Sequence, residues 1–141
     1  MKVSIEINAG IEKVFDLFTD KSRFGDWKIG FVNYEQMGST GERTKLNYKK
    51  FVLIETVLSK KKPNEYIAAY EHLQNNRTMM THRARNTFTR QGENRTLVEV
   101  ESEITEVNNF MVQIMTNLFA GAGKKQLANQ MQLFKKIVEK E

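Results

Sequence analysis

The middle of the chain is a long succession of strand-like segments without a helical stripe, and this feature constrains the fold most. From Phe31 to Thr105, Tyr, Val, Ile, Thr and Phe are frequent, as in antiparallel strands. Residues 43–50 and 52–60 lack an intervening Gly or Pro, so they form either two strands or one bulged strand. The predicted strands span about residues 30–37, 43–50, 52–60, 65–73, 78–90 and 95–106. Turn signals lie at Gly38 to Gly41, Lys62-Pro63-Asn64, Gln74-Asn75-Asn76 and Gln91 to Asn94.

A further strand and a helical segment precede this succession. The stretch from Lys2 to Asn8 alternates between apolar and polar residues, which predicts a half-buried strand. Helical spacing then continues to Thr19, and Asp20 can cap a second turn or two that ends near Trp27. The apolar residues at helical spacing are Ile11, Val14, Phe15 and Phe18. We therefore expect two short helices after the first strand.

The C-terminal segment predicts one long helix, which begins near Asn108 and Asn109 because an Asn side chain can accept from free first-turn amides. Spanning about 109–139, this helix would be on the order of 45 Å long and must pack along the sheet. Its apolar stripe changes sides near Gly121 to Gly123, from Met111, Met115, Leu118 and Ala122 to Leu127, Met131, Phe134 and Val138. Either the helix kinks there, or the series Met115, Phe119, Gly123, Leu127 and Met131 winds around it.

These elements predict a single α+β domain over residues 1–141. Its sheet would be antiparallel and curved, with about six to seven strands around the long C-terminal helix. The length of 141 residues suits one domain and is too short to divide comfortably into two.

Composition and charge narrow the possible functions. The chain has no cysteine, which excludes disulfides, thiol catalysis and Cys-ligated metal sites and fits a cytoplasmic location. The net charge is +5, but the basic clusters are scattered and lack interleaved aromatic residues, so we expect no nucleic-acid partner. No segment reaches the length of about 18 apolar residues that a membrane span requires, so we expect no stable membrane insertion.

Two partial motifs fail on inspection. The glycines and lysines from Gly121 to Lys125 partly match two motifs. A phosphate-binding loop would need its first glycine at the position of Leu118, and a dinucleotide-binding motif would need its last glycine at the position of Gln126. The only histidines, His72 and His82, lie on separate predicted strands without a Cys, so we expect neither a metal site nor a cofactor.

The segment 78–90 carries the most informative pattern. One face places His82 and Asn86 among apolar residues, while the opposite face is rich in Arg and Thr and should be solvated. Inward polar groups mixed with Met and aromatic residues predict an amphipathic cavity, and a closed core with mutually satisfied polar groups is the alternative. The candidate cavity residues are Trp27, Tyr48, Tyr70, His82, Asn86, Ser102, Met115, Phe119 and Gly123.

The order of a strand, two short helices, a strand meander and a long C-terminal helix resembles the START-like helix-grip superfamily. The resemblance spans the whole chain, and the chain is similar in particular to the polyketide cyclase/dehydrase-like members. The residues that carry it are the opening strand Val3 to Ile7, the helix Ile11 to Asp20 and the later Trp27, then Gly41, the segment Glu55 to Pro63, and Phe88 with Thr96-Leu97-Val98. The usual Pro before the first helix is replaced by Asn8-Ala9-Gly10.

The resemblance implies function only in broad terms, because these are signatures of fold. In such proteins the cavity between helix and sheet commonly holds a lipid, steroid, polyketide or similar apolar molecule. We therefore expect a binding or transport protein for a small hydrophobic molecule, as a monomer or homodimer. The alternatives are a cyclase/dehydrase-type enzyme, with His82 as acid/base and Tyr70 as polarising hydroxyl, and a protein-interaction module similar to the chaperone-activator domain.

Overall fold

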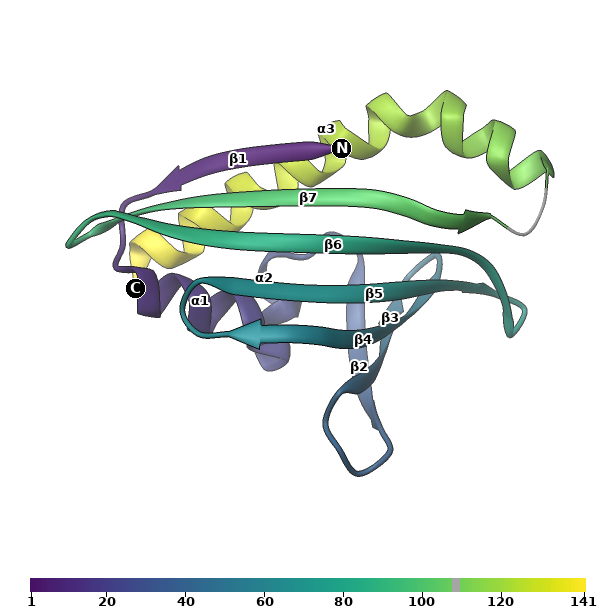
Figure 1. The fold of residues 1–141 in the computed structure, drawn as a ribbon, viewed down its shortest axis with the longest axis horizontal. Coiled ribbons are helices and arrows are strands. Elements are labelled where there is room, and N and C mark those ends of the chain that lie inside the picture. The colour runs from purple at the N-terminus through teal and green to yellow at the C-terminus, as the bar shows by residue number, and fades with distance from the viewer. Residues whose placement is uncertain (108–109) are drawn as a thin grey trace.

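The structure is a computed structural model that describes residues 1–107 and 110–141, with side chains described for 1–107 and 123–141. Figure 1 shows a long sheet with helices beside it. The elements are β1 (Lys2–Ile7), α1 (Ile11–Thr19), the 3-10 helix η1 (Lys21–Arg23), α2 (Phe24–Trp27), β2 (Phe31–Met37), β3 (Arg43–Tyr48), β4 (Val52–Lys61), β5 (Glu65–Gln74), β6 (Arg77–Gly92), β7 (Arg95–Val107) and α3 (Phe110–Lys140).

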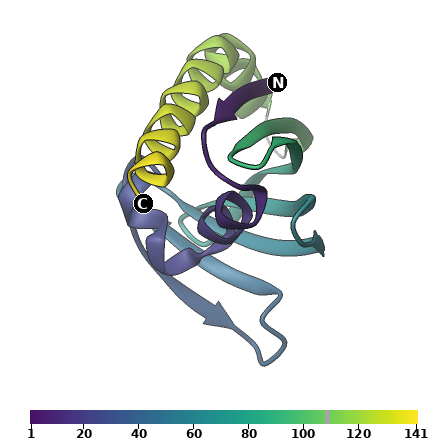
Figure 2. The same ribbon diagram turned by 90° about the vertical axis from the view of Figure 1, so that its left-hand side faces the viewer.

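The seven strands form one antiparallel sheet in the order β1-β7-β6-β5-β4-β3-β2. Consecutive strands from β2 to β7 pair with one another, and β1 returns to pair with β7. Register shifts interrupt the pairing on β4, β5 and β6, and such bulges bend strands and increase their twist. The sheet is thereby curved, and Figure 2 shows it bending past α1 and α2. The predicted α+β helix-grip architecture is confirmed.

Local sequence explains the main turns. Asn75 and Asn76 form the two-residue turn between β5 and β6, with φ of 53° and 62°. Asn tolerates this left-handed conformation better than most residues, and two such residues match the twist of a tight hairpin. β3 ends at Tyr48 and β4 begins at Val52, so the two segments without a Gly or Pro between them are separate strands.

The short helices follow the expected order. Asp20 caps η1, because its Oδ1 accepts from the Ser22 amide at 3.0 Å. The predicted second helical segment is η1 followed by α2, which ends at the expected Trp27. These turns bring Phe24 and Trp27 into the core.

The C-terminal half of α3 packs against α1, α2 and the β1 end of the sheet. Phe134 is fully buried between Phe18 and Trp27, with ring centroids 5.4 Å and 4.7 Å away. Met131 and Val138 are buried on the same side, and Leu127 packs against this core. The predicted apolar face of this half is confirmed.

The helix α3 is continuous through Gly121 to Gly123. The predicted cap at Asn108 and Asn109 lies outside the described residues. So do the side chains of the other predicted apolar face, Met111, Met115, Leu118 and Ala122. No helix in the described parts of the chain is both long enough and apolar enough to cross a membrane.

Replacing Phe134 tests the attachment of α3. We expect Phe134→Ala to lower the free energy of unfolding by about 3–5 kcal/mol, because it empties a space between buried rings. The neighbouring Leu133 is 41% exposed, so Leu133→Ala should cost less than about 1 kcal/mol. Urea unfolding of both variants measures the difference, and equal losses would show that α3 is not held at Phe134.

Candidate functional site

A cavity of about 260 Å³ lies between the inward face of the sheet and the described part of α3. Two of its lining residues, Ile29 and Phe51, remain 39% and 40% exposed, so they mark its mouth. The sheet contributes Tyr48, Leu53, Tyr70, His72, His82, Ala84, Asn86, Val100 and Ser102. The remaining lining residues are Met1, Phe18, Trp27, Lys28, Ile29, Phe51, Gly123, Gln126, Leu127, Gln130 and Met131.

Strand register brings the sheet residues together. On β6, His82 pairs with Tyr70 of β5, and Ala84 pairs with Ser102 of β7. Because alternate residues of a strand face the same side, Asn86 joins His82 and Ala84 on the inward face. The intervening Arg83 and Arg85 are exposed on the other face, as their alternation predicts.

The structure places seven of the nine candidate residues around this cavity: Trp27, Tyr48, Tyr70, His82, Asn86, Ser102 and Gly123. The side chains of Met115 and Phe119 lie outside the described residues. A Cβ added at Gly123 would meet no atom within 4 Å, so the helix faces open space there.

Two histidines form a coupled pair in the wall. His72 Nε2 and His82 Nδ1 are 2.7 Å apart, so one ring donates and the other accepts. Burial lowers the pKa of His72 to about 4. Burial, followed by the charges of His72 and Lys28, lowers the pKa of His82 to about 3. Both rings are therefore neutral near pH 7.

The geometry of His82 and Tyr70 bears on the enzymatic alternative. The two rings lie face to face, with centroids 4.8 Å apart and an angle of 13° between planes. The Tyr70 hydroxyl donates away from the imidazole, to Glu55 Oε2 at 2.8 Å. With its low pKa, His82 is a weak general base, so this arrangement does not favour acid/base catalysis by the pair.

A buried carboxylate, which the sequence analysis did not select, lies behind the cavity wall. Glu55 is 1% exposed, and it accepts from Tyr66 Oη at 2.9 Å as well as from Tyr70. Lys21 Nζ lies 3.2 Å from Glu55 Oε1 and supplies the opposite charge. Burial, with the charge of Glu55 second, raises the pKa of both tyrosines, so their hydroxyls remain protonated donors.

A sequence signal for this cluster exists. Glu55 lies two residues after Leu53 on β4, so alternation places it on the inward face, where a charge needs a partner. Tyr66 and Tyr70 share the inward face of the neighbouring strand, and Glu55 pairs directly with Tyr70 across the two strands. Lys21 lies in η1, far from β4 in the sequence, so no spacing rule links it to Glu55.

The residues after α2 add a cation at the cavity. Lys28 is half-buried, and its Nζ lies 4.4 Å from the centre of the Phe24 ring and 4.8 Å from that of Trp27. The pKa of Lys28 is lowered to about 8, chiefly by burial; the charge of Glu55 opposes this shift, and the smaller effect of the Lys21 charge adds to it. The buried Trp27 Nε1 has no hydrogen-bond acceptor among the described residues.

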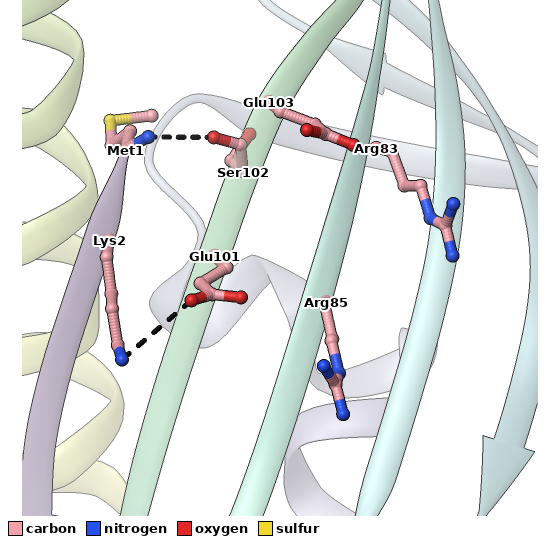
Figure 3. A pocket seen from close by; sticks show the side chains of 7 residues that line it. All are labelled: Met1, Lys2, Arg83, Arg85, Glu101, Ser102 and Glu103. Atoms are coloured by element: carbon pink, nitrogen blue, oxygen red, sulfur yellow. Dashed lines mark hydrogen bonds and ion pairs between the residues drawn. The ribbon is translucent and has the colours of Figure 1, made fainter.

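A second hollow, of about 510 Å³, lies by β1, β6 and β7, and its lining is largely charged (Figure 3). In Figure 3, Lys2 points to Glu101, and the Met1 amino group points to Ser102. Arg85 pairs with Glu65 at 3.1 Å, and more than half of its side chain is exposed. This solvated, internally paired surface is a poorer candidate site than the cavity under α3.

Within the described residues, no three His, Asp or Glu side chains gather as metal ligands.

Solved structures with the same architecture identify the fold. A conserved protein from Geobacillus kaustophilus superposes with a TM-score of 0.83 at 17% identity, over 99% of this chain and 94% of that protein. A START superfamily protein from Mycobacterium smegmatis superposes with a TM-score of 0.73 at 16% identity, over 99% of this chain and 97% of its own. The chain has a START-like helix-grip fold. DynU16, a protein in the dynemicin biosynthetic locus, has a TM-score of 0.69 at 16% identity over 99% of this chain and 46% of DynU16.

At such identities the helix-grip likeness concerns the fold alone. No protein-family model matches the chain, and no curated protein matches it in sequence. The likeness therefore assigns no function to this chain.

The histidine pair predicts a stability loss at mildly acidic pH. Between pH 7 and pH 5 the unfolded chain takes up protons near 6.5, whereas folded His72 and His82 do not until about 4 and 3. The free energy of unfolding therefore decreases from pH 7 to pH 5, by on the order of 1 kcal/mol for each histidine. Denaturant unfolding at both pH values should show a smaller fall in the His72→Phe/His82→Phe variant, and the same fall in both proteins would contradict the prediction.

Removing Lys21 should expose the cost of the buried carboxylate. We expect Lys21→Met to reduce the free energy of unfolding by about 2–4 kcal/mol, because Glu55 then stays buried without its cation. Adding Glu55→Gln to that variant should restore part of the loss. As a control, Lys62→Met breaks the exposed pair with Asp16 and should cost less than about 1 kcal/mol. Strictly additive effects of the Lys21 and Glu55 changes in thermal or urea unfolding would refute this coupling.

Proposed function

We propose that the protein binds a small, mostly apolar molecule in the cavity between α3 and the sheet. The observation that carries the proposal is the composition of the wall. Aromatic and aliphatic side chains such as Phe18, Leu127 and Met131 surround a few polar groups. Such a lining is typical of sites that bury an apolar ligand and orient it through one or two polar contacts.

The volume limits the size of the ligand. About 260 Å³ would hold roughly nine water molecules at liquid density. This space lies just below the usual range for drug-sized ligands, so it suits a molecule of one or two rings or a short chain.

The polar groups of the wall support binding more than catalysis. The Tyr70 hydroxyl already donates to Glu55, and one ring nitrogen of each histidine is used in the bond between His72 and His82. Such groups hold the cavity in shape and leave its surface predominantly apolar.

Filling the cavity from Gly123 tests this function. Gly123→Leu should abolish binding, because the new side chain enters open space that the ligand would occupy. The variant should be no less stable than the wild type, since Leu favours a helix over Gly by up to about 1 kcal/mol. Gly123→Ala is the matched control, with a similar gain in helix propensity and much less volume.

The single tryptophan gives a direct measurement, because Trp27 lines the cavity. Titration with naphthalene or 2-naphthamide should change Trp27 fluorescence saturably in the wild type and in Gly123→Ala, and not in Gly123→Leu. Saturable binding that is unaffected by Gly123→Leu would place the ligand elsewhere and overturn the proposal.

A further inference from the structure

Lys28 is the only charged side chain that lines the cavity, among the residues whose side chains the structure describes. It follows α2 directly, and the rings of Phe24 and Trp27 lie beneath its ammonium group. No described carboxylate lies within 4.0 Å of its Nζ. A cation in such a place has exchanged part of its water shell for aromatic faces and lacks a full counter-charge.

The carboxylate whose charge acts on Lys28, that of Glu55, is already engaged by other groups. Glu55 forms an ion pair with Lys21 at 3.2 Å and accepts hydrogen bonds from two tyrosine hydroxyls. It lies behind the residues that line the cavity and is not one of them. The other groups facing the cavity are the neutral pair His72 and His82, the protonated Tyr48 and Tyr70, and the amides Asn86, Gln126 and Gln130. The Met1 amino group is occupied by the Ser102 carbonyl at 2.9 Å. None of these described groups can neutralise Lys28.

We propose that the molecule bound in the cavity carries a carboxylate, which forms an ion pair with Lys28 while its apolar part contacts the aromatic and aliphatic wall. This inference rests on the proposed function and adds the chemical class of the ligand, a small apolar monocarboxylic acid. In a largely apolar cavity, a charge-assisted hydrogen bond is stronger than a neutral one. The ligand anion would supply the counter-charge that the described protein residues leave missing.

The pH dependence of binding follows from the same groups. Free Lys28 has a pKa of about 8, and an anion beside it favours the charged form and raises that pKa. Carboxylate affinity is therefore highest below pH 8 and falls as the pH rises above it. Between pH 6 and pH 10, the histidines, with pKa values of about 4 and 3, stay neutral. Tyr48 and Tyr70, whose pKa values burial raises, stay protonated over the same range.

The experiment compares acids with their neutral amides. Benzoate, 3-phenylpropionate, 2-naphthoate and octanoate, each with its amide, are titrated by calorimetry and by Trp27 fluorescence against the intact protein. We expect the best acid to bind roughly ten- to a hundredfold more tightly than its amide at pH 7. Lys28→Met should remove this preference and its dependence on pH.

Two further variants separate Lys28 from general charge effects. Lys28→Arg keeps the charge and should keep the preference for acids without a decline above pH 8, because guanidinium does not titrate there. Lys124→Met removes an exposed lysine from the helix residue next to Gly123 and should leave both affinities unchanged. Thermal unfolding confirms that each variant is folded.

The possible failures are distinct. Amides that bind as tightly as acids, or a preference for acids that survives Lys28→Met, would overturn the carboxylate inference and leave the binding function standing. If no acid and no amide binds, the proposed function fails and this inference fails with it.

Discussion

The packing of Phe134 between Phe18 and Trp27 determines how the rest of the molecule is arranged. These three rings join the last turns of α3 to α1 and α2, and the buried Met131 and Val138 extend the contact on either side. The helix is thus fixed at one end of the sheet. Its preceding turns, at Gly123 and Leu127, run over the inward face without filling it, and the cavity lies there. The orientation of α3 therefore produces both the packed core around Phe134 and the cavity beside it.

The wall of the cavity is held by polar groups that satisfy one another. Glu55 ties β4 to Tyr66 and Tyr70 on β5 and to Lys21 after α1, so strands and helices share one buried network. The bond between His72 and His82 joins β5 to β6 in a similar way. Fully satisfied networks of this kind rigidify a structure, and here they fix the shape of the surface that a ligand would meet.

The sequence predicted the architecture because alternation, turn residues and helical spacing are local properties. The inward face of β6 with His82 and Asn86 followed from period-two alternation, and Leu127 to Val138 followed from helical spacing. The importance of Glu55 and Lys28 did not follow. Patterns assign charged residues to the solvent by default, and only contacts between distant elements reveal that Lys21 pairs with Glu55 and that Lys28 lies over two rings. The role of Met115 and Phe119 stays a prediction.

A few residues depart from the usual preferences for helix propensity and for solvation of polar groups, and these residues lie together around the cavity. Gly123 lies within a long helix, where glycine costs up to about 1 kcal/mol relative to alanine. Lys28 is desolvated without a described carboxylate in contact, and two histidines are held neutral. Each feature is unfavourable for the stability of the chain alone, and all of them line the same cavity. Sequences are locally consistent with their fold except where function requires otherwise, so this convergence is the strongest physical argument that the hollow has an occupant.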